Sequence, residues 1–558
     1  MSGSDEVASP TGTDGDTRGR SFNIIVVGAG INGSGIAREA ALRGLRVLLL
    51  DKGDIANGTT SWATRLIHGG LRYLEYREVG LVRESLRERE RLLQLAPHLV
   101  RPLPLIIPIY KGDRRHRALI QAGMLAYDLL SFDKSLPRHR MLGRNDALRR
   151  EPGLNPDGLA GAAVYYDAQV EYAERLAVEN ALDARAHGAD LRTYHQVDRI
   201  LVDKGQVTGV SGRDTLTGEP FTAQAPVVIN VAGPWVDSVL AGVPQLPRER
   251  LIGGTKGSHI VVGSFAGSPH DALYAESRSD GRPFFIIPWN DAYLIGTTDT
   301  RYEGNLDNVV AEDWEIDLLL EETNRVIPCA GLSRDAVRYS YAGVRPLPYV
   351  AGGKEGAITR RHIVRDHGAE GGPGGLYSIV GGKLTTYREL AEQAIGLASQ
   401  AHGWPNSRSS SAESPLPGGR SDMTWTKFQQ SFLESSPLPI AASRHLLRVY
   451  GTRAAEVLAA AATPYLQETI DPATGAIAAE IPWAFEHEGA RTLTDAIARR
   501  TMIGLGPQLG VGIDEVAAKV ARETLGWDRS RAEREVDAYR EWIRRYRPRN
   551  IGPIDTSV

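Results

Sequence analysis

The amino-acid sequence predicts an α/β protein with an antiparallel β substrate domain and an all-α C-terminal domain. A strand, glycine turn, helix and second strand occupy residues 22–51, an order that is typical of a parallel sheet covered by helices. Apolar runs broken by Gly, Pro, Asn and Asp fill residues 251–345 and indicate antiparallel strands. Apolar residues at helical spacing dominate residues 422–545 and predict the C-terminal helices.

The unit at residues 22–51 begins with a short apolar, β-branched run that predicts a buried strand. Three glycines, Gly28, Gly30 and Gly33, follow at GxGxxG spacing. Gly28 allows a tight turn, Gly30 lets a pyrophosphate approach the backbone, and Gly33 lets the helix pack closely on the strand. The free N–H groups at the helix start then favour phosphate oxygens.

Asp51 closes the second strand, 18 residues after Gly33, where a carboxylate can accept hydrogen bonds from an adenosine ribose. Because strand, helix, strand and acid are in register, we expect a Rossmann-type dinucleotide site and not a bare βαβ turn. The hydroxyl-rich loop 52–65 could follow a long cofactor, and no second GxGxxG has this setting. Both features favour FAD over NAD.

Composition excludes several classes of protein. The chain has 558 residues, 42% of them hydrophobic, with a net charge of −3, so we expect a large core and no nucleic-acid partner. A single cysteine, Cys329, cannot form an intramolecular disulfide, which fits a reducing cytoplasm. Residues 1–20 are polar and predict a disordered tail, not a signal peptide. The sequence contains no run of 18 apolar residues, so we expect no membrane-spanning segment.

Residues 100–143 combine apolar and basic side chains. They predict either a strand and helix with solvated charges or a surface that lies on anionic lipid. We expect an FAD-binding domain with an interleaved substrate (cap) domain at residues 21–400. A linker rich in Ser, Pro and Gly follows at 401–420, before a helical domain at 421–545.

Two polar motifs have competing interpretations. Gly381 and Gly382 lie between a strand and a helix start, so they either aim N–H groups at a flavin or form a plain turn. His487 lies between two glutamates, but the spacing does not suit paired helical metal ligands. We therefore expect a structural polar network that includes Arg499 and Arg500, and no metal site.

Four motifs together resemble the FAD-dependent glycerol-3-phosphate dehydrogenases. They are Gly28–Gly33, the stretch Ser61–Glu75 with its core RLIHGGLRYLE, the stretch Gly343–Leu347 and the stretch Gly381–Thr386. The similarity covers about residues 20–545, including the segment from Glu486 to Thr501. The only minor departure is Asp51, where related flavoproteins commonly have Glu.

The resemblance implies that sn-glycerol 3-phosphate is oxidised to dihydroxyacetone phosphate, with hydride passing from C2 to FAD and electrons to a membrane quinone. It also implies peripheral attachment to the cytoplasmic membrane and a possible homodimer. A phosphate ester needs fixed cations. We expect substrate binding by Arg72, Tyr73, Arg345, Arg360 and Lys383.

Loss of the C2 hydroxyl proton needs a base or a nearby cation. We expect His259 to accept this proton, with Arg345 and Lys383 as electrostatic stabilisers. The alternatives are a surface salt bridge for each arginine and a core strand position for His259.

The motifs and the resemblance together assign the cofactor site. The family implies that Val197 and Gly233 contact the adenine half, and that Ser61 and Thr64 flank the isoalloxazine. The expected cofactor-binding residues are Gly28, Gly30, Asn32, Gly33, Asp51, Lys52, Thr60, Ser61, Thr64, Leu66, His68, Gly69, Val197, Ala232, Gly233, Trp235, Gly343, Arg345, Gly382, Lys383, Leu384 and Thr385.

Three other functions remain open from the residues alone. An oxidase of the same substrate would use O₂, although the low-complexity insertion of related oxidases is not visible before residue 400. An amine or amino-acid oxidase shares the two-domain plan but has no need for so many cations. A flavin-binding regulator would use the helical domain as a partner surface.

Overall fold

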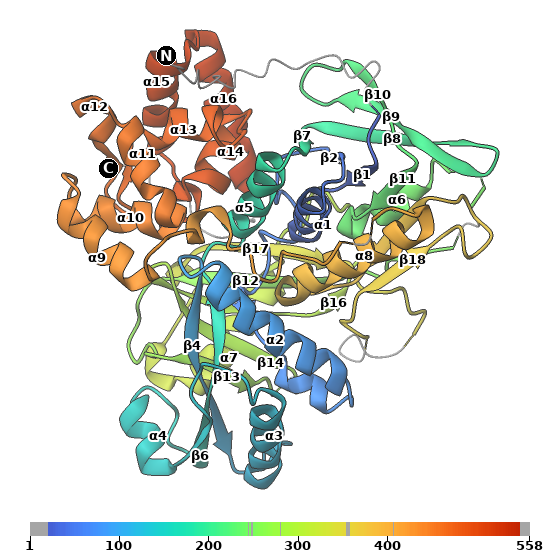
Figure 1. Cartoon of the computed structure of the whole chain (residues 1–558). Helices are drawn as coiled ribbons and strands as arrows, with labels where there is room; N and C mark the ends of the chain where they lie inside the picture. The colour runs from blue at the N-terminus through green and yellow to red at the C-terminus, as the bar shows by residue number, and fades with distance from the viewer. Residues whose placement is uncertain are drawn as a thin grey trace.

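The computed structural model describes residues 21–546, apart from 244, 247–248, 279–280, 353–357 and 406. The predicted tail at residues 1–20 lies outside this described part. Two large sheets and a C-terminal group of helices make up the fold (Figure 1). The predicted fold class is confirmed.

The first sheet contains the predicted βαβ unit. It is parallel except for its edge strand β18, which runs antiparallel to β19. All residues of the two strands of the unit are buried, as the uninterrupted apolar runs require of a sheet covered on both faces. The strands in spatial order are β18 (Ile363–Asp366), β19 (Leu376–Val380), β11 (Val227–Asn230), β1 (Ile24–Val27), β2 (Val47–Leu50) and β7 (Asp190–Arg192).

Three helices cover one region of this sheet. Helix α1 (Ile31–Leu42) packs against both α5 (Ala173–Ala186) and α8 (Tyr387–His402). A Cβ atom on Gly33 would lie 1.7 Å from the carbonyl oxygen of Gly28, so only glycine allows this approach of helix and strand. The predicted packing role of Gly33 is confirmed.

The second sheet has ten strands and is almost wholly antiparallel, with one parallel pair between β13 and β4. Its path is β16 (Thr300–Arg301), β12 (Thr255–Val262), β15 (Ala292–Gly296), β14 (Pro283–Trp289), β13 (Ala272–Glu276), β4 (Val100–Tyr110), β6 (Leu159–Val170) and β3 (Leu66–Ile67), with β17 (Val337–Arg345) beside β12 and β5 (Arg140–Gly143) beside β6. Three further strands form a small antiparallel sheet, β10 (Pro220–Gln224), β9 (Gln206–Asp214) and β8 (His195–Asp203).

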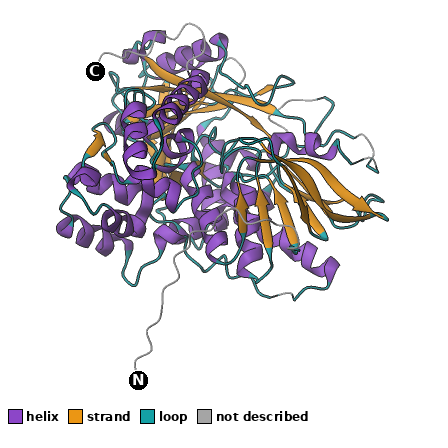
Figure 2. Ribbon diagram, turned by 90° about the horizontal axis from the view of Figure 1, so that it is seen from above, coloured by secondary structure: helices purple, strands orange, loops and turns teal. Residues whose placement is uncertain are grey.

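Several helices belong to the region of the antiparallel sheet. Helix α7 lies inside the stretch expected to be mostly β structure; it begins with a capping box between Glu312 and Glu315 that fixes its first turn. Figure 2 shows the strands in separate groups with helices between and around them. Besides α1, α5 and α8, the helices outside the C-terminal part are α2 (Val79–Leu95), α3 (Arg117–Leu130), α4 (Arg144–Arg150), α6 (Val236–Leu240) and α7 (Asp313–Val326).

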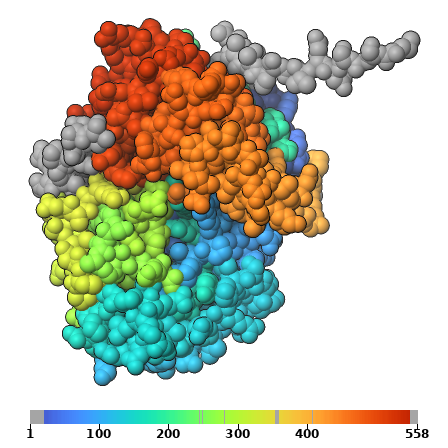
Figure 3. All heavy atoms as spheres, turned by 90° about the vertical axis from the view of Figure 1, so that its left-hand side faces the viewer, coloured from blue at the N-terminus to red at the C-terminus, as the bar shows by residue number. Residues whose placement is uncertain are grey.

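The C-terminal part is helical and forms a separate block on the outside of the molecule (Figure 3). Its elements are α9 (Trp425–Ser435), α10 (Ile440–Tyr450), α11 (Ala454–Ala460), α12 (Pro464–Gln467), the strand pair β20 (Thr469–Asp471) and β21 (Ala476–Ile477), α13 (Glu480–Glu486), α14 (Leu493–Asp495), α15 (Ile513–Leu525) and α16 (Arg529–Ile543). Helix α14 is short and continues as a π-helix, Ala496–Arg500.

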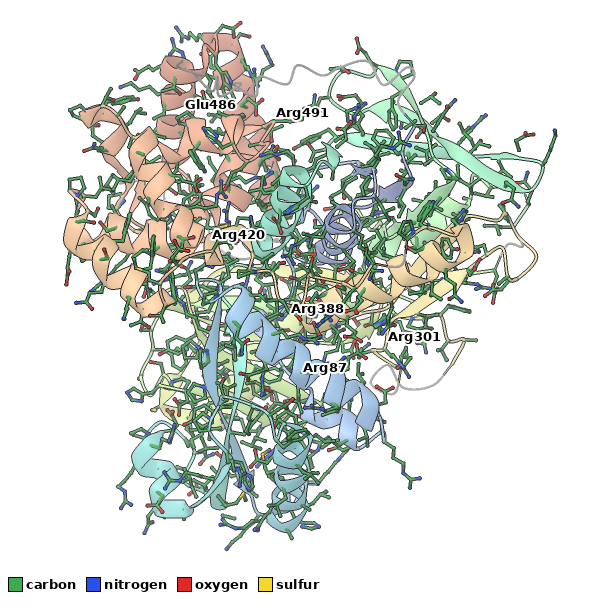
Figure 4. The ribbon with its side chains drawn as sticks, in the orientation of Figure 1. Arg87, Arg301, Arg388, Arg420, Glu486 and Arg491 are labelled. Atoms are coloured by element: carbon green, nitrogen blue, oxygen red, sulfur yellow. The ribbon has the colours of Figure 1, made fainter. Side chains whose placement is uncertain are left out.

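Ion pairs connect helix α8 with helix α2, and the C-terminal part with the small sheet. Arg388 of α8 pairs with Glu88 of α2 at 2.7 Å, and Arg491 of the C-terminal helices pairs with Asp214 of β9 at 2.9 Å (Figure 4). The stretch expected to be a linker is also packed, because Leu416 is fully buried. Among the described residues, no helix is long and apolar enough to cross a bilayer.

Candidate active site

A cavity of about 570 Å³ is lined by residues of both large sheets. Gly28 follows β1, Val231 follows β11 and Gly381 follows β19, so the cavity lies at the carboxyl ends of parallel strands. Ligands of open α/β sheets bind at this edge. His259 of β12 and Arg345 of β17 line the cavity from the antiparallel sheet.

The glycine turn forms the nucleotide end of the cavity. Gly28 has a φ of +112°, and a Cβ there would lie 2.7 Å from the carbonyl oxygen of Val231. One oxygen of Asp51 accepts a hydrogen bond from the backbone N–H of Ala29 (2.6 Å), and the other accepts one from Gly53 (2.9 Å). Burial raises the pKa of Asp51, and these two donors oppose that rise.

Unpaired polar atoms at the cavity provide a test of whether a dinucleotide fits. Within the described residues, the side-chain oxygens of Asn32 and Asn57 and the indole nitrogen of Trp235 are buried without a hydrogen-bond partner. All three residues line the cavity. Because buried polar groups are normally satisfied, their arrangement beside the glycine turn fits a large polar ligand such as FAD.

Most of the residues expected to bind the cofactor line the cavity. Three of them lie behind its wall: Gly33 packs α1 on β1, Ser61 donates its hydroxyl to Ala56 O (2.6 Å), and Gly69 donates its N–H to the Tyr127 hydroxyl (2.9 Å). Those that line it are Gly28, Gly30, Asn32, Asp51, Lys52, Thr60, Thr64, Leu66, His68, Val197, Ala232, Gly233, Trp235, Gly343, Arg345, Gly382, Lys383, Leu384 and Thr385.

A pair of arginines that line the cavity shares one carboxylate. Arg345 Nη1 lies 3.0 Å from Oδ1 of Asp299, and Arg360 Nη2 lies 3.3 Å from Oδ2. Arg345 also donates to the hydroxyl of Thr297 at 3.0 Å. Within the described residues, Arg360 Nη1 is buried and has no hydrogen-bond partner. This free donor and the neighbouring Arg345 can donate hydrogen bonds to a phosphate group.

The charges of this pair are set by burial and by each other. Burial lowers the pKa of Arg345, and the adjacent Arg360 lowers it further, whereas Asp299 opposes both effects. Burial would raise the pKa of Asp299, but the two guanidinium groups outweigh it and hold that pKa below its ordinary value. Sequence reasoning missed Asp299; its only signal is an acid at the end of the run Tyr293–Asp299.

His259 is buried in the wall of the cavity. Its Nε2 lies 2.9 Å from the Thr64 hydroxyl, and its ring stacks on Tyr341 with the centroids 4.9 Å apart. Its Nδ1 is buried and has no partner among the described residues. Burial, followed by the charges of Arg345 and Arg65, holds its pKa far below the ordinary value. The imidazole is therefore neutral at pH 7 with a nitrogen lone pair available, and the same shift makes it a weaker base than a free histidine.

Lys383 also lines the cavity, but its ammonium group has backbone and hydroxyl partners. Nζ donates to the carbonyl oxygen of His68 and to the Ser85 hydroxyl, each at 3.0 Å, and lies 4.9 Å from the centre of the Tyr73 ring. Burial lowers the pKa of Lys383 to about 7. Its charge therefore changes within the physiological pH range.

Arg72 and Tyr73 are neighbours in the chain but differ in their position relative to the cavity. Tyr73 lines the cavity, and the charge of Arg360 acts on its hydroxyl. Arg72 donates to the Tyr76 hydroxyl at 3.2 Å and does not line the cavity. Substrate contact by Arg72 stays a prediction.

The C-terminal helices add residues that sequence reasoning missed. Trp542 and Arg545 line the cavity, and the Trp542 ring lies 6.4 Å from that of Trp62. Nearly 480 residues separate these two tryptophans in the chain, so no local motif links them. Part of the expected polar network is present: Arg500 Nε donates to the carbonyl oxygen of Glu488 at 3.1 Å, and Arg175 of α5 donates to the Glu488 carboxylate at 3.0 Å.

Comparison with known proteins identifies two regions of the chain. Residues 23–388 match the family model described as FAD dependent oxidoreductase, and residues 409–532 match the C-terminal domain of alpha-glycerophosphate oxidase. The chain is 46% identical to the glycerol-3-phosphate dehydrogenase of Synechocystis sp., over 94% of this chain and 96% of that protein. It is 37% identical to the D-erythritol 1-phosphate dehydrogenase of Brucella abortus, over 86% of this chain and 94% of that one.

A solved structure extends the similarity to the fold. The glycerol-3-phosphate dehydrogenase from Bacillus halodurans, complexed with FAD, matches with a TM-score of 0.77 and 26% sequence identity. The match covers 97% of each chain and therefore includes the C-terminal helices.

Proposed function

The chain belongs to the family of FAD-dependent glycerol-3-phosphate dehydrogenases, and from this premise we propose that it oxidises sn-glycerol 3-phosphate at C2 to dihydroxyacetone phosphate. The observation that carries the proposal is the arginine pair, Arg345 and Arg360, in the same cavity as the glycine turn. A phosphate ester dianion bound there would place a small polyol within the cavity that fits the flavin.

The residues that would hold FAD follow from the nucleotide end of the cavity. The start of α1 borders the cavity through Gly30, Ile31 and Asn32 and would hold the pyrophosphate, and Asp51 has acceptor capacity left for a ribose. When bound, FAD supplies the acceptor for the hydride of C2. The protein supplies orientation, charge and a proton acceptor.

The substrate phosphate is bound by two arginines, which one carboxylate holds in position. Arg360 Nη1 and the guanidinium of Arg345 bind the phosphate, because guanidinium forks match phosphate oxygens in shape and charge. Asp299 fixes both guanidinium groups by one carboxylate, so the pair is set before substrate arrives. Tyr73 lines the cavity beside the pair.

Proton removal from the C2 hydroxyl falls to His259. The neutral imidazole is buried and has one nitrogen without a partner in the described part of the chain. Arg345 is close enough to act on His259 electrostatically, so a negative charge that develops on the C2 oxygen is stabilised on the same side of the cavity.

The test is anaerobic loss of the oxidised flavin absorbance on addition of substrate. The panel is sn-glycerol 3-phosphate, D-erythritol 1-phosphate, glycerol and a set of amino acids; the second compound is included because of the Brucella abortus relative. We expect bleaching by glycerol 3-phosphate and none by glycerol. Bleaching by an amino acid instead would contradict the proposal.

For the electron acceptor, we propose a membrane quinone, reached by a protein that lies on the cytoplasmic face of the membrane. The support is a group of exposed apolar side chains at α3, here called the α3 patch: Leu119, Leu125, Leu129 and Phe132, the last two 73% and 74% exposed. Arg114, Arg117 and Arg138 nearby are also exposed. Apolar side chains bordered by cations suit an anionic bilayer surface.

The α3 patch lies at the end of the molecule opposite the C-terminal helices (Figure 1). The rival acceptor is O₂. Steady-state oxidation of glycerol 3-phosphate is therefore measured with a soluble quinone and, separately, with air alone. We expect turnover to need the quinone; rapid O₂ uptake with peroxide release in its absence would favour an oxidase.

A further inference from the structure

A buried ion cluster attaches the loop after β2 to the C-terminal helices. Oδ2 of Asp54 lies 2.6 Å from Nε of Arg499 and 2.8 Å from Nη1 of Arg500, whose Nη2 donates to Oδ1 at 2.8 Å. Asp54 and Arg500 are fully buried, and Arg499 is 3% exposed. Charge-assisted bonds from two guanidinium groups hold a carboxylate in one position.

The same loop carries contacts to the cofactor cavity on its other side. Asp51 lies three residues before Asp54, and the backbone N–H of Ala56 donates to Ala29 O in the glycine turn at 3.0 Å. The next residues, 57–60, line the cavity. A displacement of Asp54 would therefore also move Asp51 and residues 57–60, which line the cavity.

A second connection holds the start of the loop to the same helices. Arg499 Nη2 donates to Oδ1 of Asp495 at 2.6 Å, and that oxygen also accepts from the Tyr194 hydroxyl at 2.6 Å. The backbone N–H of Tyr194 in turn donates to Gly53 O at 2.8 Å. Arg499 thus reaches the loop by two routes.

The cluster is charged under ordinary conditions. Burial would raise the pKa of Asp54, but the two arginines outweigh burial and hold this pKa below its usual value. Asp54 thus stays ionised at neutral pH, and breaking the cluster would leave buried charges without partners. Arg499 also lies 5.6 Å from the centre of the Trp542 ring, which lines the cavity.

We propose that the C-terminal helices clamp bound FAD, with Arg499 and Arg500 holding the loop of residues 51–60 in place through Asp54. These three are positioning residues, because none of them lines the cavity. FAD leaves only when the loop moves, so the intact cluster slows its release. The inference rests on FAD binding, a property of the family, and not on the identity of the substrate.

The experiment compares Asp54→Asn with Glu488→Gln in the full-length holoprotein. Glu488 is a matched control: its side chain is also fully buried, pairs with Arg453 at 2.7 Å and with Arg175 of α5 at 3.0 Å, and does not touch the loop. Its hydrogen bond with the cluster is made by the backbone carbonyl oxygen, which accepts from Arg500 Nε at 3.1 Å and is kept in Glu488→Gln. FAD release is followed by flavin fluorescence after dilution, and the melting temperature of each apoprotein is recorded.

We expect Asp54→Asn to release FAD about ten times faster than the wild type, the effect of one lost charge-assisted contact. Glu488→Gln should release FAD at close to the wild-type rate, although both variants melt at lower temperature. Equal release rates for the two variants would overturn the proposal, since general destabilisation would then explain the loss.

A second pair of variants, each with a smaller change, covers the case in which Asp54→Asn does not fold. Arg499→Lys keeps the charge but loses the fork, and Arg453→Lys makes the same change at Glu488. Faster release from Arg499→Lys than from Arg453→Lys supports the clamp. The same release rate from both variants would refute it.

Discussion

Asp299 pairs with both of the arginines that we propose to bind the substrate phosphate. Its two oxygens take one guanidinium each, at 3.0 and 3.3 Å from Arg345 and Arg360. Two cations so close repel each other in a buried site, and the shared carboxylate offsets this repulsion. The pair can thus be held ready beside His259 without a bound substrate.

Removal of Arg345 should weaken both substrate binding and the chemical step. We expect Arg345→Ala to raise KM, to lower kcat and to reduce kcat/KM about 100-fold, or about 3 kcal/mol of transition-state stabilisation. Arg345→Lys should recover part of the loss, because it restores charge without the fork. Arg334→Ala, which removes a partly exposed arginine paired with Asp317, is the control. Unchanged kinetics in Arg345→Ala would remove this residue from the site.

The charge of Lys383 should appear in the pH profile. Because its pKa lies near 7, the ammonium form is lost as pH rises, and with it a stabilising cation. We expect kcat/KM to fall between pH 7 and 9, a range in which the substrate phosphate is already a dianion. Arg remains protonated throughout this range, so Lys383→Arg should flatten the profile. An identical fall in that variant would assign the titration to another group.

At the scale of elements, sequence reasoning succeeded where the signal is local. The β1–α1–β2 unit follows from its own glycines and apolar runs, which need no distant partner to be recognised. Helix α7 was missed because the surrounding strands suggested β structure, whereas a capping box at Glu312 fixes a helix. Trp542 reaches the cavity only through tertiary packing, so no spacing rule could predict it.

The α3 patch should control membrane attachment without affecting the chemistry. We expect the triple change of Leu125, Leu129 and Phe132 to Ser to reduce binding to anionic liposomes at least about ten-fold, which is the loss expected if only one of the three side chains inserts and contributes about 1.5–3 kcal/mol. Turnover with a soluble acceptor should stay at the wild-type level. The control is Met423 and Ile440 to Ser, which changes exposed apolar residues of the C-terminal part. Undiminished liposome binding in the triple variant would exclude the patch.

At the scale of the whole molecule, three parts of the chain enclose one cavity. The parallel sheet provides the glycine turn, the antiparallel sheet provides His259 and Arg345, and the C-terminal helices provide Trp542. The residues expected from motifs could be located individually, but Asp299 and the Asp54 cluster are defined by which strands and helices meet. These tertiary contacts depend on packing between segments that are distant in the chain, and a single sequence carries no direct signal for them.

The central claim is that this cavity joins a flavin to bound glycerol 3-phosphate, whose C2 hydrogen leaves as hydride. The most direct measurement is anaerobic rapid mixing of the holoprotein with sn-glycerol 3-phosphate and with the same compound carrying deuterium at C2. We expect the oxidised flavin absorbance to disappear with both, several-fold more slowly with deuterium. A flavin that stays oxidised at saturating glycerol 3-phosphate would contradict the account.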